Sequence, residues 1–296
     1  MNVHPLPDPR QQAKATRIGR PDGGRDLPQN PMLDLEFAQL SDVGRVRDHN
    51  EDYLGCVAPE TPVETRHRGW LFALADGVGG QDCGEVASRA AVETVMTGFR
   101  ESDGKEPLTT LLPRLIQAAN SHVYETGAGT PKGSNMATTL VTCVFRFDRV
   151  VVAHVGDSRC YLVRKGEATI LTRDHTVANE NKNLGMLSGW AGGEAPGRHV
   201  LSRSVGNDLV VGVDTATHQI FSGDVFLLCS DGLHGAVPAA KIARIVTDAP
   251  DLHTAAQSLV AIANERDGSD NVSVQLVRVR RVERVGMYRG RPYRLR

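Results

Sequence analysis

The chain has 296 residues, of which 40% are hydrophobic, and its formal net charge is −1 at pH 7. This composition allows one large core, and the balanced charge excludes a global attraction to nucleic acid or to an anionic membrane. No apolar run reaches the ~18 residues of a membrane span and no secretory signal begins the chain, so we expect a cytoplasmic protein. The five cysteines are scattered and odd in number, which favours small core residues over a disulfide framework.

Residues 1–32 are predicted to form a disordered tail. They hold six of the 15 prolines and show almost no periodic apolar pattern, so they cannot bury enough surface to order themselves. Their basic residues could bind a partner, but a solvated tail is the simpler interpretation. We expect the folded domain to begin with the alternating, strand-like pattern of residues 33–40.

Acidic residues recur where strand-like patterns begin or end. The apolar run from Trp70 ends in an acid followed by a glycine, and three other acidic sites have a similar position beside an apolar or aromatic run. Carboxylates at strand ends, with no Cys/His cluster beside them, suit hard divalent cations, so we predict Mg²⁺ or Mn²⁺. The sites are Glu51-Asp52, Asp76, Asp231 and Asp270.

The first of these sites lies in a polar loop, residues 43–52, with two arginines and several acids. Adjacent Glu51 and Asp52 cannot face the same way on an extended chain, so one can bind a metal while the other holds a metal-bound water. Taken alone, the loop is more typical of a solvated charged turn, because runs of charge are usually solvated faces.

The middle of the chain is predicted to contain two helices followed by a meander of strands. Helical spacing covers residues 85–96 and 108–124, and β-branched runs cover 138–145, 150–155 and 160–163. Asp157, in the turn between the last two strands, is either a metal ligand or a residue whose side chain bonds its own turn. His154, inside an apolar strand, is interpreted as a core histidine.

The polar, glycine-rich stretch 174–200 is predicted to be a mobile flap over the active cleft, with an insertion of no function as the alternative. Beyond it we expect further strands, two helices and a last strand. Residues 282–296 form a basic tail with interleaved tyrosines, either solvated or a weak site for an anionic partner. The expected elements are strands 210–213, 218–221, 225–228 and 272–279 and helices 239–246 and 252–264.

This order of elements indicates two antiparallel sheets packed face to face with a helix pair outside each sheet. The predicted architecture is therefore a four-layer αββα sandwich of the α+β class. It forms one domain over residues 33–281. The four acidic sites are expected to meet at one end of the sandwich.

Seven short motifs in order along the chain resemble those of the metal-dependent protein phosphatases, the protein phosphatase 2C family. No single motif is decisive, but seven in family order are specific. Without an extra domain, the chain is most similar to bacterial single-domain members that oppose Ser/Thr kinases. The motifs are Arg47-x-x-Asn50-Glu51-Asp52, Ala75-Asp76-Gly77-x-Gly79-Gly80, Met136-Ala-Thr138-Thr139, Val155-Gly156-Asp157-Ser158-Arg159, Leu201-Ser-Arg203-Ser-Val-Gly206, Ser230-Asp231-Gly232 and Asp270-Asn271-x-Ser273.

The resemblance implies a metal-dependent protein serine/threonine phosphatase that hydrolyses phosphoserine and phosphothreonine. It implies two Mg²⁺ or Mn²⁺ ions bridged by Asp76. Glu51 and the carbonyl of Gly77 would bind one ion, and Asp231 and Asp270 would complete the protein ligands of the other.

The same resemblance implies how hydrolysis proceeds. Water activated by the two ions would attack phosphorus directly, so no side-chain nucleophile is required. Asp52 would orient this water, and the planar guanidinium of Arg47 would hold two phosphate oxygens.

Two departures from the family pattern qualify the match. Val78 takes the position where animal members often carry a histidine as general acid, so another acid, such as water, must protonate the leaving oxygen. Ser134 and Asn135 stand where bacterial members tend to have an aspartate for a third metal, and Ala137 replaces a glycine. We predict that a third metal site is weak or absent, because neutral oxygens offset the desolvation of a cation less than a carboxylate does.

Two other functions fit parts of the pattern. A catalytically weak, phosphoprotein-binding regulator of the same fold would be expected to lack metal carboxylates, yet the central ones are present. A metal-dependent nuclease would favour a basic groove, which this near-neutral chain does not indicate. We therefore expect phosphorylated proteins and a cognate kinase as partners, no nucleic acid, no membrane span and a monomer.

Overall fold

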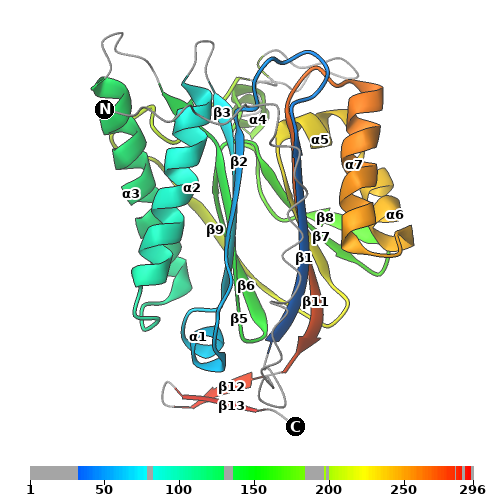
Figure 1. Cartoon of the computed structure of the whole chain (residues 1–296). Coiled ribbons are helices and arrows are strands. Elements are labelled where there is room, and N and C mark those ends of the chain that lie inside the picture. The colour runs from blue at the N-terminus through cyan, green and yellow to red at the C-terminus, as the bar shows by residue number, and fades with distance from the viewer. Residues whose placement is uncertain are drawn as a thin grey trace, which may run out of the picture.

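A computed structural model describes residues 33–78, 83–129, 136–183, 197, 200–283, 285–288 and 291–294 of the chain. Two β-sheets lie face to face, and helices cover the outer surface of each sheet (Figure 1). The predicted four-layer αββα sandwich is therefore confirmed. Among the described residues, no helix is long and apolar enough to cross a membrane.

The first sheet has the strand order β2-β3-β5-β6-β9, and the short strand β4 pairs with β3. Every neighbouring pair is antiparallel. Its strands are β2 (Asp52–Val57), β3 (Trp70–Val78), β4 (Ala137–Thr138), β5 (Leu140–Arg146), β6 (Arg149–Val155) and β9 (Asp214–Gln219).

The second sheet has the order β1-β11-β10-β7-β8 and is also antiparallel throughout. The first and last strands of the folded domain, β1 and β11, are neighbours in it. Its strands are β1 (Leu33–Asp42), β7 (Arg159–Arg164), β8 (Glu167–Ile170), β10 (Val225–Cys229) and β11 (Val272–Val282).

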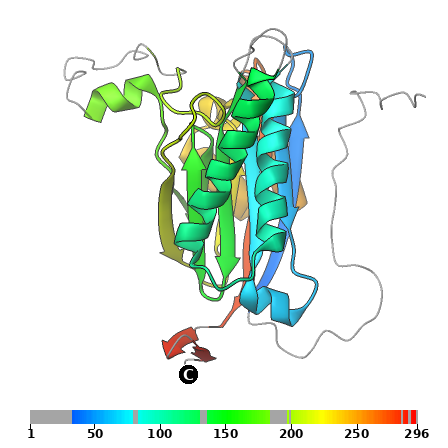
Figure 2. The ribbon, with the colours of Figure 1, turned by 90° about the vertical axis from the view of Figure 1, so that its left-hand side faces the viewer.

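Two long helices cover the first sheet and lie side by side across it (Figure 2). They are α2 (Gly84–Glu101) and α3 (Leu108–Ala128). The second sheet is covered by α5 (Asp231–Ala236), α6 (Ala239–Asp248) and α7 (Leu252–Arg266). Two short helices, α1 (Pro62–His67) and α4 (Val177–Asn183), lie in connections for which the sequence patterns predicted no helix.

Three apolar clusters hold these layers together. The central one lies between the sheets and is built on aromatic side chains, with Phe145 packed edge to face against both Phe72 and Phe226. The outer clusters bury α2 and α3 against one sheet and α6 and α7 against the other. Strands β3, β5 and β10 are apolar along nearly their whole length because both of their faces are covered.

One predicted strand is absent from the described structure. Residues 210–213 run in irregular backbone before β9, and Val210 is 77% exposed. Side chains of α3 bind backbone polar groups of Val211 and of the two residues before the segment, since Gln117 bonds both Leu209 and Val211 and Asn120 bonds Asp208. The β-branched composition predicted a strand, but these side chains satisfy the backbone instead of a neighbouring strand.

The ends of the folded domain lie together. Leu33, which begins β1, is paired with Val282, which ends β11. Beyond β11, the segment predicted as a basic tail contains a hairpin of β12 (Val285–Tyr288) and β13 (Arg291–Arg294). The predicted N-terminal tail, residues 1–32, and most of the predicted flap, residues 184–196 and 198–199, lie outside the described residues.

Candidate metal centre

The acidic sites predicted from the sequence come together at one end of the sandwich. Asp52 begins β2 and is paired directly with Asp76, near the end of β3. In the other sheet, Asp231 follows β10 and Asp270 precedes β11. The β1–β2 and α7–β11 loops meet at this end, where the amide of Arg45 donates to the carbonyl of Gly268 at 2.8 Å (Figure 1).

Asp52 is buried between the two sheets. Its Oδ2 accepts a hydrogen bond of 2.8 Å from the hydroxyl of Ser230, and Oδ1 has no hydrogen-bond partner among the described residues. Burial raises the pKa of Asp52 to about 7, although the nearby hydroxyls of Ser273 and Ser230 lower it, and the charges of Asp231 and Asp270 add to the rise. Asp52 therefore has an unmet negative charge and an unused acceptor.

Asp76 is fixed through its backbone. Its amide donates to Thr139 Oγ1 at 2.9 Å, and its carbonyl accepts from Thr138 Oγ1 and from the amide of Thr139, both at 2.8 Å. Burial raises the pKa of Asp76 well above its ordinary value, and the charges of Asp52, Asp231, Asp157 and Asp270 raise it further. Asp76 thus interacts electrostatically with acidic groups from both sheets.

Glu51 and Gly77 lie beside this pair. The amide of Glu51 donates to Asn271 Oδ1 at 2.8 Å, and its carbonyl accepts from the amide of Gly77 at 3.1 Å. A Cβ atom at position 77 would lie 2.3 Å from the carbonyl oxygen of Gly84, so only glycine allows the start of α2 to approach this closely. Burial raises the pKa of Glu51, Arg47 lowers it, and Asp270 raises it again.

Arg47 pairs with two of the predicted ligands. Its Nη2 donates to Asp270 Oδ2 at 2.9 Å, and its Nη1 lies 3.9 Å from Glu51 Oε2. The guanidinium is therefore at the acidic end of the sandwich, as expected for a group that holds a phosphate there. A divalent cation on these oxygens would compete with Arg47 for them.

Asp157 is a further buried carboxylate of this end. Burial raises its pKa to about 7, and the charge of Asp231 contributes next. Its turn is fixed by Gly156, which has φ +100° and where a Cβ atom would lie 2.7 Å from the side chain of Thr139. A hydrogen bond between His234 Nε2 and the Asp157 carbonyl also holds the turn. The sequence left a turn role and a ligand role open, and the observed position is compatible with both. An acid two residues after the end of the apolar strand β6 was the available signal.

The acidic end has the chemistry of a divalent-cation site. Its carboxylates repel one another in a buried setting, and no described residue bonds Asp52 Oδ1. Bound Mg²⁺ or Mn²⁺ would offset this charge and accept exactly such oxygen donors. Gly79 and Gly80 of the motif, and the Ser134-Asn135 pair used to predict a weak third site, lie outside the described residues.

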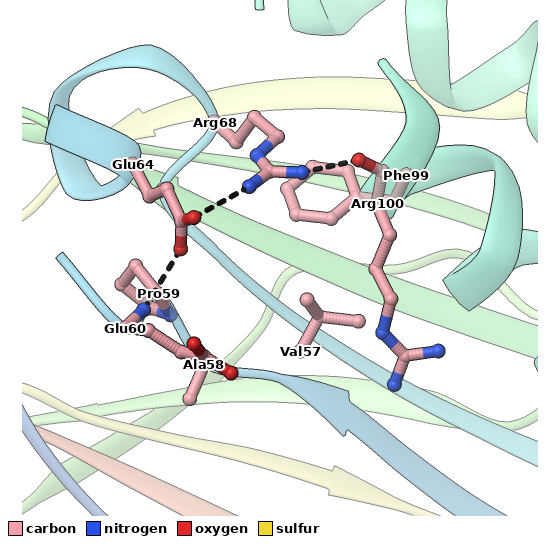
Figure 3. A pocket seen from close by; sticks show the side chains of 9 residues that line it. Val57, Ala58, Pro59, Glu60, Glu64, Arg68, Phe99 and Arg100 are labelled. Carbon is pink, nitrogen blue, oxygen red and sulfur yellow. Dashed lines mark hydrogen bonds and ion pairs between the residues drawn. The ribbon is translucent and has the colours of Figure 1, made fainter.

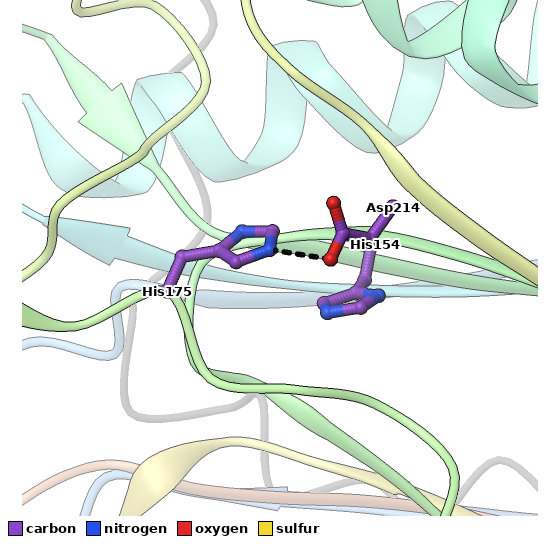
Figure 4. A group of neighbouring side chains, drawn as sticks. All are labelled: His154, His175 and Asp214. Atoms are coloured by element: carbon purple, nitrogen blue, oxygen red, sulfur yellow. Dashed lines mark ion pairs between the residues drawn. The ribbon is translucent and has the colours of Figure 1, made fainter. Parts of the chain in front are cut away.

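A second cluster of metal-ligand residue types lies nearby but has a different character (Figure 4). This histidine cluster consists of His154, His175 and Asp214, whose ligand atoms lie within 4.8 Å of one another. Its two imidazole rings stack with their centroids 4.8 Å apart. His175 Nδ1 accepts from the amide of Gly156 at 3.1 Å, which leaves the proton on Nε2. That nitrogen lies 3.2 Å from Asp214 Oδ2, at ion-pair distance but outside hydrogen-bond geometry.

This tautomer argues against a metal ion in the histidine cluster. The lone pair of His175 is already used by Gly156, and Nε2 of His154 lies between the amide and carbonyl of Arg173, 3.2 and 2.9 Å away. Burial lowers the pKa of both histidines, so both are neutral near pH 7. His154 is a buried core histidine, as the sequence predicted.

A cavity of about 210 Å³ lies at the opposite end of β2 from Asp52 (Figure 3). It contains the Arg68–Glu64 ion pair of 3.1 Å, over a floor that includes Phe99. None of the predicted site residues lines it, so it is separate from the acidic end.

Comparisons with known proteins agree with this geometry. Residues 45–270 match the family model described as protein phosphatase 2C. The serine/threonine phosphatase stp of Listeria innocua is 34% identical over 254 residues, which are 85% of this chain and 96% of that protein.

Solved structures give the same result. The structure of the Streptococcus agalactiae serine/threonine phosphatase matches with a TM-score of 0.76 and 32% identity, covering 83% of this chain and 100% of that one. The catalytic domain of the phosphatase PstP, solved in complex with two manganese ions, matches with a TM-score of 0.67 and 31% identity, covering 83% and 98%. The chain belongs to the protein phosphatase 2C family.

Proposed function

We propose that the acidic end of the sandwich is the active site at which this chain hydrolyses phosphoserine and phosphothreonine in proteins. Proteins of the protein phosphatase 2C family are metal-dependent Ser/Thr phosphatases that use Mg²⁺ or Mn²⁺, and this chain is one of them. The observation that carries the site assignment is the pairing of Asp52 with Asp76, which places two desolvated carboxylates opposite each other. One oxygen of Asp52 has no hydrogen-bond partner within the described part of the chain.

We assign the metal ligands from this arrangement. Asp76 would bridge two ions, Glu51 and the carbonyl of Gly77 would bind one, and Asp231 and Asp270 the other. When bound, such ions lower the pKa of a shared water and offset the charge of the phosphate. The backbone contacts of Asp76 with Thr138 and Thr139 hold its carboxylate in place.

Two other side chains act on water and substrate in this proposal. Asp52 presents Oδ1, which no residue in the described ranges bonds, as an acceptor that orients the attacking water, while Ser230 fixes the other oxygen. Arg47 binds phosphate oxygens with its planar guanidinium, which is 46% exposed and so accessible to substrate. Val78 offers no proton at the position after Gly77, so another acid, such as water, must protonate the leaving alkoxide.

We extend the proposal to the cellular setting. The matched relatives named above are bacterial Ser/Thr phosphatases, which supports phosphorylated proteins and a cognate Ser/Thr kinase as partners. A monomer in the cytoplasm is the remaining part of this proposal. A third metal site is predicted to be weak, and a manganese titration by calorimetry should give two strong sites per chain.

The test is turnover of a phosphothreonine peptide and of a generic phosphomonoester by the purified protein. We expect activity with Mn²⁺, none in excess EDTA, and none from an Asp76→Asn variant. Tight peptide binding without turnover would favour the phosphoprotein-binding regulator. Cleavage of an oligonucleotide without phosphomonoesterase activity would favour a nuclease.

A further inference from the structure

The β1–β2 loop, residues 43–51, lies at the acidic end and carries two arginines in different states (Figure 1). Residues 45–49 of this loop are all exposed, and Val46, between the arginines, is 70% exposed. Arg47 is paired with two of the predicted metal ligands. The guanidinium of Arg45 has no hydrogen bond or ion pair with any residue that the structure describes. Arg45 is therefore a charged group beside the proposed active site that catalysis leaves unused.

The loop is held rigidly by one buried side chain. Asn271 Nδ2 donates to the carbonyls of Val43 and His49, both at 2.9 Å, and Asn271 Oδ1 accepts from the amide of Glu51 at 2.8 Å. The amide group of Asn271 thus ties the two ends of the loop together. The exposed residues between these ends stand on a fixed backbone, so a partner that binds them pays little to order the loop.

Arg45 itself is anchored on one side and open on the other. Its amide donates to the carbonyl of Gly268 at 2.8 Å. Its Cγ and Cδ atoms would lie 3.1 Å from a Cβ atom at position 268, so the aliphatic stem of Arg45 packs along Gly268. The residue as a whole is exposed. This combination holds the stem against the α7–β11 loop and leaves the charged end accessible from solvent.

The distance between the two arginines indicates what Arg45 can reach. Their Cα atoms are no more than about 7.6 Å apart, because consecutive Cα atoms are separated by about 3.8 Å. That distance is the length of roughly two residues of an extended peptide. When Arg47 binds the phosphate of a substrate, Arg45 therefore lies beside a substrate residue that is close to the phosphorylated one in sequence.

We propose that Arg45 determines substrate specificity by binding a carboxylate side chain of the substrate protein, within about three residues of the phosphorylated residue. The inference rests on the proposed function, because it takes Arg47 as the group that binds the phosphate. A planar guanidinium presents parallel N–H groups to a carboxylate, which makes acidic side chains its best protein partners.

The same loop offers one competing group. Asp48 is also exposed and would attract a basic side chain of the substrate. Arg45 is favoured because its stem already lies against Gly268, so less side-chain freedom is lost when it binds. Peptides of opposite charge decide between the two residues.

The test compares phosphothreonine peptides of one sequence that carry Glu, Gln or Lys two residues before and after the phosphothreonine. We measure kcat/KM for each with the full chain and Mn²⁺. The Glu peptide should exceed the Gln peptide by about two- to fivefold, because an exposed ion pair contributes modestly, and the Lys peptide should be the poorest. The preference should arise in KM, and it should shrink when the salt concentration is raised to about 1 M.

Two variants assign this preference to Arg45. Arg45→Gln should abolish the preference for the Glu peptide, and Arg45→Glu should reverse it in favour of the Lys peptide. Both should keep the wild-type turnover of p-nitrophenyl phosphate, which carries no flanking residue. The matched control is Arg149→Gln, which removes the same charge from a side chain that is 66% exposed at the start of β6. It should keep the wild-type preference for the Glu peptide.

The possible failures are distinguishable. If the wild type hydrolyses p-nitrophenyl phosphate but treats the three peptides alike, Arg45 has no role in specificity and the phosphatase proposal stands. A preference for the Lys peptide would assign recognition to Asp48, and a Glu preference that survives in Arg45→Gln would assign it to another group; either result overturns the inference. If neither the small ester nor any peptide is hydrolysed with Mn²⁺, the proposed function fails together with it.

Discussion

The acidic end and the histidine cluster contain similar ligand types but balance their charges in opposite ways. At the acidic end, Asp52 and Asp76 face each other, burial raises the pKa of both carboxyls, and the charge of Asp52 raises that of Asp76 further. One oxygen of Asp52 has no hydrogen-bond partner among the described residues. In the histidine cluster, Asp214 has Arg203 3.2 Å from one oxygen and His175 3.2 Å from the other. A metal site is therefore recognised by carboxylate charge that neighbouring side chains do not neutralise, and not by the presence of histidine and carboxylate alone.

The same chemical change in the two clusters should give the largest difference. Asp76→Asn is expected to lower phosphatase turnover by about a thousandfold or more, because activation of water and neutralisation of the phosphate both depend on the metal centre. Asp214→Asn should lower turnover by less than about tenfold, because it acts only through packing and orientation. Calorimetry with Mn²⁺ should show strong binding lost in the first variant and kept in the second. Equal loss of metal in both would mean that the histidine cluster binds metal.

The pH dependence of the unfolding free energy should give the second-largest difference between the two clusters. Asp52 has a pKa of about 7 in the folded chain and near 4 when unfolded, so its contribution to stability is present at low pH and is lost as pH rises through 7. In EDTA, the unfolding free energy of the wild type should fall by on the order of 4 kcal/mol relative to that of Asp52→Asn between pH 4 and 8, because the folded chain holds the proton of Asp52 more tightly than the unfolded chain does. Urea unfolding at several pH values measures this difference. A flat difference would show that Asp52 is not desolvated.

The histidine cluster should show the opposite sign. Burial lowers the pKa of His175, so its stabilising contribution is present above the unfolded value near 6.5 and is lost as pH falls. The wild type should therefore lose stability relative to His175→Gln below about pH 6. Added Mn²⁺ should reverse the pH dependence of stability that Asp52 causes, because metal binding favours the ionised carboxylate. It should leave the pH dependence that His175 causes unchanged.

Much of the fold could be predicted because its strands and helices follow local patterns. The apolar run from Trp70 is β3, and the helical spacing from Leu252 is α7. Local patterns failed at residues 210–213, where side chains from α3 bind the backbone. The C-terminal hairpin was also missed, because its arginines and tyrosines show no clear apolar alternation.

The candidate site was predictable in its ligand types and less so in its supporting contacts. Strand ends placed Asp76, Asp231 and Asp270 correctly at one end of the sandwich. The bond from Ser230 to Asp52 joins residues 178 apart in sequence, and the bond from Glu51 to Asn271 joins residues 220 apart. Such contacts depend on how the two sheets pack, which no local periodicity specifies. The assigned roles of the site residues remain predictions that the variants described here test.

Each cluster also contains an arginine, and variants of these two arginines should differ by a smaller amount than the aspartate variants do. Arg47→Ala should raise KM and weaken inhibition by phosphate by about tenfold, because it removes a bidentate partner of the phosphate. Arg203→Ala removes a similar guanidinium from Asp214 and should leave KM for a small phosphomonoester unchanged. Steady-state kinetics with both variants provides the measurement. If Arg47→Ala leaves KM unchanged while metal affinity collapses, Arg47 has a structural role instead.

The smallest expected effect concerns the hydroxyl that links the sheets at Asp52. Ser230 Oγ donates to Asp52 at 2.8 Å and accepts from the amide of Ser273 at 2.9 Å, with the hydroxyl fully buried. Ser230→Ala leaves both partners unsatisfied and should cost about 1 to 2 kcal/mol of unfolding free energy. It should also raise the pKa of Asp52 further, because a hydrogen bond to the charged form is lost.

The matched control for this change is Ser202→Ala, whose hydroxyl donates to Glu180 at 2.8 Å near the histidine cluster. That hydroxyl is only partly buried and water can replace it, so the loss of unfolding free energy should stay below about 1 kcal/mol. Urea unfolding compares the two variants, and the pH–rate profile reports the effect on Asp52. An unchanged profile in Ser230→Ala, with stability lost as expected, would mean that the hydroxyl supports the fold without tuning the carboxylate that orients water.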